Sequence, residues 1–495
     1  MDTILWVLLA VQICLGAFDT LWHHEFTERL AWRASQKHEL SLHGVRNLIY
    51  AGLFLTLGLA FPSGGLATIA LGVLGVELVI TLKDFVEEDQ TRRLPASERI
   101  THTLLALNYG AILTLLVPEL LTRTSGETGL VPVDNGLWAW FMSAAALGVG
   151  IFGVRDLLAS ARLGRLGRTP AKDLFERLHL EGQVLITGGT GFIGTRLVEA
   201  FVAQGLSVTV LTRHTKSAAH LPTPIRLVTS LDQIGRQEVF TAIINLAGEP
   251  LAASLWTKAH LKRVTQSRLV STVNIARLIA RLDHKPACVI NGSAIGIYGV
   301  ACDTPTRESD TIVNDASFGQ ELCRVWESAA ATIAALGVRT VVLRTGLVLD
   351  RDGGPLGQML FPFEFGIGGP FGSGRHWMSW ITRDDLVRLI GHCIADDRAV
   401  GPINGVAPNP ATNRDFARAL GAALHRPAVL PVPEFILRLG LGGLGREVLL
   451  GSQKVVPQKA LDLGFVYSQT DLNVALINLV RPVGIKDNIA LQPAT

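Results

Sequence analysis

The pattern of hydrophobic and polar positions divides the chain into two parts. Residues 1–158 carry five long apolar runs, at about 4–18, 45–61, 66–82, 103–121 and 137–157. A membrane crossing needs about 20 apolar residues in a helix, so this part is predicted to be an all-α transmembrane bundle of five helices. The remainder has the short apolar runs of an ordinary globular α/β chain.

Basic residues in the connections predict the orientation of these helices. Arg and Lys gather in 19–46, in 83–99 and after residue 157, whereas 62–65 and 122–135 hold only Arg123. The positive-inside rule then places the N-terminus outside and everything after residue 158 in the cytoplasm. The first run lacks a basic start and a small-residue cleavage site, so we expect a retained helix rather than a signal peptide. These features predict a multi-pass protein of the inner membrane.

The connections expected on the cytoplasmic side also hold acids and histidines. Glu39 and His43, like Glu98 and His102, are four residues apart and would share a helix face. Such groups converging from several helices hold divalent metals in helix bundles, and they suggest metal or quinone chemistry. The alternative is that they lie in wetted loops and form salt bridges with the arginines.

The second part alternates short apolar runs with helical stretches. Strands are predicted at 184–187, 207–212, 242–247, 287–291 and 338–343. This alternation favours a doubly wound parallel sheet with helices on both faces, over residues 182–400. Residues 401–495 are expected to form a smaller, mostly helical substrate domain. The segment 159–181 alternates Arg with Leu and Gly, and is either a basic juxtamembrane linker on the anionic leaflet or a simple positive stop.

A glycine turn follows the first of these strands. Gly188 allows a sharp turn, Gly191 allows close approach to a pyrophosphate, and Gly194 allows a helix at 195–204 to pack on the strand. The N-terminus of that helix offers free N–H groups to the phosphates. Arg213 stands where NAD-preferring sites usually carry an acid, and a cation there suits a 2′-phosphate. The sequence therefore predicts a dinucleotide site that prefers NADP(H) to NAD(H), with Lys216 as a further candidate near the phosphate.

Composition limits the other possibilities. The net charge is only +3, which gives no broad basic field for a nucleic acid. The five cysteines are scattered without metal-ligand spacing, as in a chain with free thiols in a reducing compartment.

Several motifs over about 182–482 resemble one family. They are GGTGFIG at 188–194, INLAGEP at 244–250, SAIGIYG at 293–299, LRTG at 343–346 and GSGRHWMSWI at 372–381. This series resembles the atypical, extended short-chain dehydrogenase/reductases called epimerase family proteins, which carry a DUF1731-like C-terminal domain. The resemblance does not extend to the apolar first part.

The resemblance implies a Rossmann fold with bound NADP(H) and assigns residues to it by motif. Those lining the pyrophosphate would be Gly188, Thr190, Gly191, Phe192 and Ile193, those under the adenine ribose Leu246, Ala247 and Gly248, and Ser293 would sit beside the nicotinamide.

The usual catalytic pair of the superfamily is missing. Phe318 and Leu322 stand where typical members have the Tyr and Lys of a Tyr-x-x-x-Lys pair, and neither can transfer a proton. Tyr298 is the candidate replacement acid beside Ser293, or else a packed aromatic. Arg344 and Arg375 are candidates for holding an anionic substrate group, with a salt bridge as the alternative for Arg344.

Three functions remain open on these grounds. The first is a membrane-tethered NADP(H)-dependent oxidoreductase or epimerase acting on an amphiphilic or lipid-linked substrate. The second is a non-catalytic NADP(H) sensor that controls the membrane part. The third passes electrons from NADPH to a metal held by the acid and histidine residues of the bundle.

Overall fold

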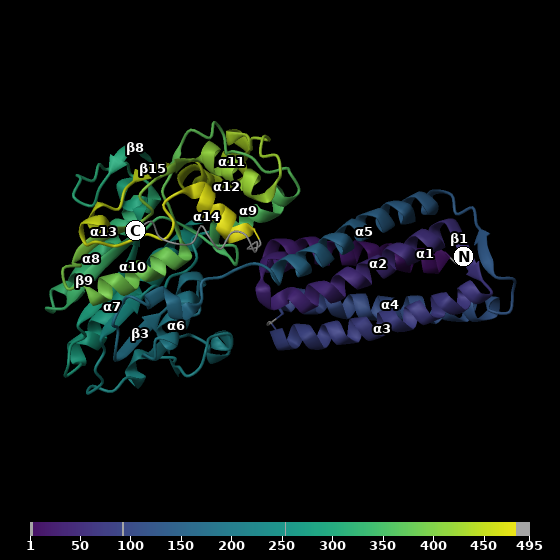
Figure 1. Cartoon of the computed structure of the whole chain (residues 1–495), viewed down its shortest axis with the longest axis horizontal. Coiled ribbons are helices and arrows are strands. Elements are labelled where there is room, and N and C mark those ends of the chain that lie inside the picture. Colours follow the sequence, from purple (N-terminus) through teal and green to yellow (C-terminus); the bar gives the residue numbers. More distant parts are fainter. Residues whose placement is uncertain (1–2, 92–93, 253, 482–495) are drawn as a thin grey trace. The chain divides into compact units, whose positions relative to one another are not determined.

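A computed structural model describes residues 3–91, 94–252 and 254–481 (Figure 1). It divides into two compact units, one of residues up to Leu166 and the other of Gly167–Arg481. The first unit is helical and the second is built on a parallel sheet. Each unit is described on its own below.

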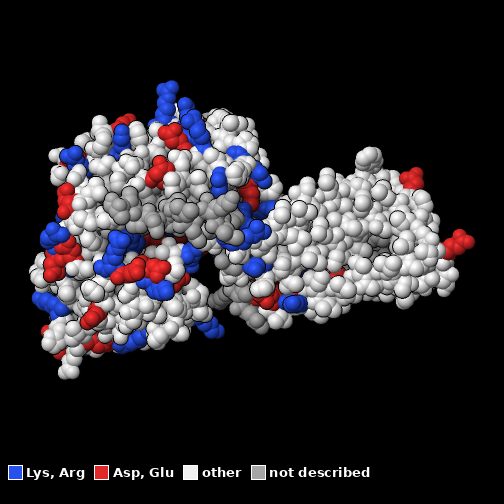
Figure 2. Space-filling view, viewed as in Figure 1, with Lys and Arg blue, Asp and Glu red and all other residues white. Residues whose placement is uncertain are grey.

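The helical unit contains the five predicted helices. They are α1 (Thr3–Phe18), α2 (Lys37–Leu59), α3 (Gly65–Thr91), α4 (Ala96–Arg123) and α5 (Leu137–Leu163). All five are long and apolar enough to cross a membrane, and many large apolar side chains point outward, such as Leu107 at 69% and Leu147 at 68% exposure. The surface of this unit is almost free of charge except at its ends (Figure 2). An apolar exterior of this kind suits lipid rather than water.

The helices are longer than the apolar runs. Residues 19–28 form a π-helical segment, η1 (Asp19–Glu28), and α2 begins at Lys37 instead of near residue 45. Likewise, α3 continues to Thr91 and α4 already begins at Ala96. The polar positions expected in wetted loops therefore lie on helices, and Glu39, His43 and Glu98 are buried. The hydropathy pattern missed these turns because their polar side chains face one another inside the bundle.

The second unit is built on a sheet of parallel strands, as the alternation predicted. Its order in the described residues is β13-β9-β7-β6-β3-β4-β5. The strands are β3 (Gln183–Thr187), β4 (Ser207–Leu211), β5 (Arg226–Val228), β6 (Ala242–Asn245), β7 (Cys288–Ala294), β9 (Arg339–Thr345) and β13 (Gly401–Gly405). The reversal of strand order beside β3 is the topological switch point, where open α/β sheets bind ligands.

Helices cover both faces of this sheet. One apolar core joins it to α6 (Phe192–Ala203) and α10 (Arg383–Ala395), through residues such as Phe201 and Ile390. Another joins it to α7 (Lys258–Arg281) and α8 (Phe318–Ala334), through Leu278 and Ile333. The two layers hold the strand ends rigidly in place.

The rest of this unit consists of short elements. They are η4 (Ala171–Phe175), η5 (Thr215–Ala218), η6 (Leu231–Gln233), η7 (Ile295–Tyr298), β8 (Ala301–Thr306), β10 (Leu347–Leu349), α9 (Gly354–Glu364), β11 (Trp377–Met378), β12 (Trp380–Thr382), β14 (Ala411–Thr412), α11 (Asn413–Leu424), α12 (Glu434–Leu444), η8 (Gly445–Leu449), β15 (Ser452–Val455), α13 (Gln458–Asp462) and α14 (Leu472–Val480). The parallel pair of β15 and β8 links the C-terminal segment to the loop that follows β7.

Candidate nucleotide site

The turn after β3 has the geometry that a dinucleotide site requires. Gly188 has a φ of +74°, and the Gly191 N–H donates to the Gly188 carbonyl at 3.0 Å. A Cβ on Gly188 would meet the backbone of Leu246 at 2.7 Å, and one on Gly194 would lie 2.1 Å from the Gly188 oxygen. Side chains are therefore excluded here by the backbone itself, and α6 begins directly at the turn with Gly191 as its N-cap.

The neighbouring residues of the turn have different surroundings. Thr190 and Ile193 are half-buried and Gly191 is exposed. The Phe192 ring lies under the Arg383 guanidinium, with 4.9 Å between the guanidinium carbon and the ring centre. This contact fixes the first residue of α6 against α10, so that the first-turn N–H groups keep their direction.

A buried polar network supports the carboxyl ends of the adjacent strands. The Thr187 hydroxyl donates to Asn245 Oδ1 at 2.7 Å, and Asn245 Nδ2 donates to Asn291 Oδ1 at 2.7 Å. The Ala247 N–H donates to the Thr187 hydroxyl oxygen at 3.3 Å. Leu246 and Ala247 are half-buried and Gly248 is exposed. The network thus holds the segment that follows β6 beside the glycine turn.

A cavity of about 360 Å³ opens beside the end of β4. Its wall includes Leu211, Ser230, Asn274 and Arg281. Arg213 lies two residues beyond β4 and is exposed, as is Lys216. Both basic residues therefore lie on an exposed loop that follows β4.

The structure joins three of the candidate residues through a fourth that sequence analysis did not assign. Glu327 on α8 accepts from Ser293 Oγ at 2.7 Å and from Arg344 Nε and Nη2 at 2.9 and 2.8 Å. Arg344 Nη1 donates to the Tyr298 hydroxyl at 2.8 Å, which donates to Asn404 Oδ1 at 2.8 Å. Glu327 lies outside the motifs named above, so these motifs carried no signal for it.

These hydrogen bonds affect the pKa of Tyr298 and of Arg344, and they limit which other groups the two side chains can contact. Burial raises the pKa of the Tyr298 hydroxyl. Burial alone would lower the pKa of Arg344, but the hydrogen bonds and charge of Glu327 outweigh it and raise that pKa. The Arg344 guanidinium, a candidate for holding a substrate anion, is therefore already engaged in an ion pair with Glu327.

The positions of the missing catalytic pair are occupied by packing groups. Phe318, the first residue of α8, packs edge-on against Trp256, with ring centres 5.2 Å apart, and Leu322 is buried. The Glu447 carboxylate accepts from the N–H groups of Phe318 and Gly319 at 3.3 and 3.0 Å. The start of α8 is thus capped by the C-terminal segment.

Arg375 lies apart from this chain of hydrogen bonds, in an exposed turn after Gly374, whose φ is +67°. Its backbone N–H donates to Ser373 Oγ at 3.3 Å. The structure therefore brings together Ser293, Tyr298 and Arg344, whereas Arg375 is not a member of the described chain.

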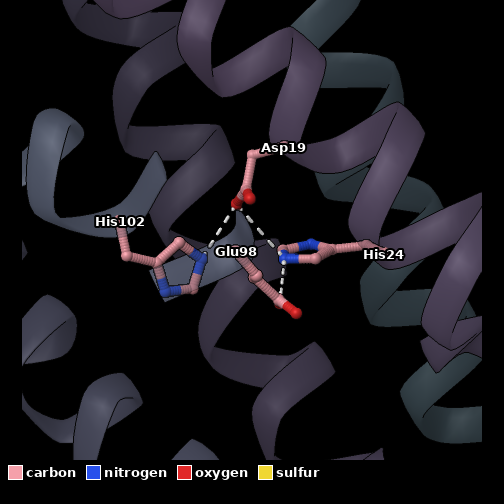
Figure 3. Close-up of side chains that lie close together, drawn as sticks. All are labelled: Asp19, His24, Glu98 and His102. Carbon is pink, nitrogen blue, oxygen red and sulfur yellow. Dashed lines mark hydrogen bonds and ion pairs between the residues drawn. The ribbon is translucent and has the colours of Figure 1, made fainter. Parts of the chain in front are cut away.

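The acid and histidine candidates of the helical unit fall into two groups. Glu98 and His102 lie with Asp19 and His24 (Figure 3), and His43 lies with His24 and Glu88. Glu39 is buried one helical turn before His43 and belongs to neither group of the described residues.

Comparison with known proteins identifies the second unit. Residues 184–349 match the NAD dependent epimerase/dehydratase family, and residues 432–479 match a domain of unknown function, DUF1731. Neither match reaches the helical unit.

Individual relatives agree with these matches. Epimerase family protein SDR39U1 of Bos taurus is 38% identical over 301 residues, which cover 60% of this chain and 99% of that protein. Epimerase family protein YfhF of Bacillus subtilis is 34% identical over 299 residues, covering 60% and 97%. The crystal structure of human epimerase family protein SDR39U1 with NADPH has a TM-score of 0.54 and 34% identity, covering 60% of this chain and 99% of that one. The chain belongs to the epimerase family, with an NAD(P)-binding Rossmann fold and a DUF1731 C-terminal domain.

Proposed function

We propose that this chain is a membrane-tethered, NADP(H)-binding member of the epimerase family that acts at the cytoplasmic face. The observation that carries the proposal is the turn from Gly188 to Gly194, where backbone atoms occupy the space that a Cβ would need at Gly188 and Gly194, and where α6 begins with Gly191 as its N-cap. In this proposal the pyrophosphate lies over the turn, bound by the residues named for it: Gly188, Thr190, Gly191, Phe192, Ile193 and Gly194. The adenine ribose lies over Leu246, Ala247 and Gly248.

Arg213 is proposed to select NADP(H) over NAD(H). Its loop is exposed and follows the end of β4, so a guanidinium there can contact a 2′-phosphate at a smaller desolvation cost than a buried ion pair would carry. The related human protein was crystallised with NADPH, which supports the same preference. A charge-assisted hydrogen bond of this kind contributes about 1.5–3 kcal/mol.

The substrate end is proposed to lie at Ser293, between the sheet and the segment that follows β13. The Ser293 hydroxyl is held by Glu327, and Tyr298 and Arg344 complete the chain that fixes it. Arg375, exposed in its glycine turn, is the cation available for an anionic substrate group. Five apolar helices on the same chain favour an amphiphilic or lipid-linked substrate.

A nucleotide titration of the full-length protein in detergent tests the proposal. NADPH should bind more tightly than NADH, and Arg213→Glu should weaken NADPH about 10- to 100-fold while changing NADH little. Arg418→Glu, the same charge reversal on an exposed residue of α11, is the matched control and should change neither. Equal losses for both nucleotides in Arg213→Glu would refute the selection of the phosphate, and no binding to either would refute the nucleotide site.

A second function is a non-catalytic NADP(H) sensor. It is favoured by Phe318 and Leu322, because neither side chain can transfer a proton as the usual Tyr and Lys do. The two functions differ in turnover. An oxidoreductase oxidises NADPH with some member of a panel of lipid-linked and sugar-nucleotide carbonyls, whereas an epimerase inverts a centre of a sugar nucleotide without net loss of nucleotide. In either case Ser293→Ala abolishes the rate while NADPH still binds. A sensor binds NADPH and shows no rate with any member of the panel.

A further inference from the structure

One end of the helical unit gathers polar side chains from four segments. Asp19 and His24 come from η1, His43 from α2, Glu88 from α3, and Glu98 and His102 from α4. Since α1 ends, α2 starts, α3 ends and α4 starts with these residues, they all meet at the same end of the bundle. Asp19, His24 and Glu98 are at most 7% exposed. We call Asp19, His24, Glu98 and His102 the polar cluster; Figure 3 shows their side chains turned toward one another.

The distances within the polar cluster are those of ligands around one ion. The Asp19 Oδ2 atom lies 3.0 Å from His102 Nε2 and 3.3 Å from His24 Nε2. His24 Nε2 lies 3.7 Å from Glu98 Oε1, and one ligand atom from each residue fits within 4.8 Å of all the others. Bonds of about 2.0–2.2 Å to a metal place neighbouring ligand atoms about 3–3.6 Å apart. Two imidazoles with two carboxylates are the donor set of Zn²⁺, Fe²⁺ or Mn²⁺.

The orientation of the histidines points to a ligand beyond these side chains. The buried Nε2 atoms of His24 and His43 lie 3.3 Å from Asp19 Oδ2 and 2.9 Å from Asp84 Oδ2, but neither approach has hydrogen-bond geometry. Asp84 also pairs with Arg46 at 2.8 Å. The two rings stack with 4.6 Å between centres and 6° between planes. Buried polar atoms normally have hydrogen bonds, and an ion held between an imidazole and a carboxylate is one arrangement that accounts for atoms without them.

Outer contacts fix the cluster as they do in metal sites. The His102 Nδ1 atom lies 3.3 Å from Glu88 Oε2, on the opposite side of the ring from Asp19. His23 Nδ1 lies 2.8 Å from Asp19 Oδ1, and its Nε2 lies 3.2 Å from Ser97 Oγ. A carboxylate behind a ligating histidine, and a partner behind a ligating carboxylate, set the direction of the ligands.

A cavity of about 270 Å³ reaches the polar cluster from inside the bundle. Its wall includes Asp19, His24 and His102 together with apolar side chains such as Phe54, Leu105 and Phe152. A metal that keeps one side open to such a cavity has room for a further ligand, as catalytic sites do and closed structural sites do not.

We propose that the polar cluster binds a divalent transition-metal ion whose open side faces this apolar cavity. The ligands are Asp19, His24, Glu98 and His102, with His43 and Glu88 next to them. The cavity then takes an amphiphilic molecule with an oxygen or nitrogen head group at the metal. This inference does not depend on the nucleotide site of the other unit.

Metal titration of the full-length protein in detergent tests the proposal. Protein stripped with a chelator should bind about one equivalent of Co²⁺, give visible ligand-field bands and release the Co²⁺ to Zn²⁺. His102→Gln and Glu98→Gln should each weaken Co²⁺ binding at least about tenfold. His38→Gln is the matched control, because His38 lies exposed near the start of α2, and it should bind Co²⁺ like the unaltered protein.

A second measurement needs no variant. Co²⁺ should raise the Tm of the unaltered, stripped protein, because an ion that binds only the folded state stabilises it. Saturable binding together with the rise in Tm supports the site. Absence of saturable Co²⁺ binding by the stripped protein, or an equal loss of binding in His38→Gln, would overturn it and leave an ion-pair network of histidines and carboxylates.

Discussion

The glycine turn makes a prediction whose size follows from the structure. In Gly194→Ala the new Cβ would lie 2.1 Å from the Gly188 oxygen and 2.7 Å from the Gly189 Cα. Both are backbone atoms, so α6 must move by roughly 1 Å before ordinary contact distances return. Such overpacking costs about 1–3 kcal/mol, which corresponds to a fall in Tm of roughly 2–10 °C for this unit. The shift also turns the first N–H groups of α6 away from the phosphates, and NADPH affinity should fall at least about tenfold.

Two further alanine substitutions separate folding from binding. Gly191→Ala has a compatible φ of −86° and a contact only with the Gly188 oxygen, at 3.2 Å, so it should keep its Tm and lose NADPH affinity. Gly440→Ala, in open space on α12, is the matched control and should lower neither.

Thermal unfolding gives the Tm of the three variants, and NADPH fluorescence titration gives their affinity for the nucleotide. An unchanged Tm and affinity for Gly194→Ala would show that α6 does not rest on the turn as described. Unchanged affinity for Gly191→Ala would show that the pyrophosphate does not lie over it.

Two other changes test the second unit. Glu327→Gln removes the charge that faces the buried Arg344 but keeps a hydrogen-bonding side chain, so it should lower the free energy of unfolding by about 1–3 kcal/mol and lower the Tm. The control Glu321→Gln changes an exposed residue of the same helix and should leave the Tm unchanged. Equal effects of the two variants would refute a specific role for the Glu327–Arg344 pair. Burial lowers the pKa of His376 below its unfolded value near 6.5. The unfolded chain then takes up this proton first as the pH falls, and the stability that depends on neutral His376 is lost in that direction. His376→Gln should therefore lose less Tm than the unaltered protein between about pH 7.5 and about pH 5, and an identical pH profile would contradict this reasoning.

The sheet and its glycine turn were predictable because their signals are local. A strand that ends in Gly188 and a helix that starts by Gly194 carry their information within a dozen residues, and the structure has both where they were expected. The same holds for the five apolar helices, whose length is set by about 20 consecutive residues. Their polar ends were missed because a charged residue lowers hydropathy equally in a wetted loop and in a buried cluster.

Partners from distant segments were not predictable. The spacing of four residues placed Glu98 with His102 and Glu39 with His43. In the structure the first pair meets Asp19, 83 residues away from His102, and His43 meets Asp84 and Glu88 of α3. Residue spacing shows only which side chains share one face of a helix. How that helix is rotated and shifted along its axis relative to its neighbours depends on packing, which the spacing does not show.

The same limit applies to the chain through Glu327, and it bears on whether the protein is an enzyme. In the sequence Ser293, Tyr298 and Arg344 had separate predicted roles, but the structure joins all three in one series of hydrogen bonds. Ser293 and Arg344 both donate to Glu327, and Arg344 also donates to Tyr298. The Tyr298 hydroxyl accepts a hydrogen bond from Arg344 and donates one to Asn404, so it cannot approach a substrate without breaking two buried hydrogen bonds. We therefore propose that Ser293, whose hydroxyl donates to Glu327, and not Tyr298, contacts the substrate at the nicotinamide. If turnover exists, it must depend on Ser293 more than on Tyr298: Ser293→Ala should abolish the rate, and Tyr298→Phe should reduce it only as far as the position of Arg344 changes.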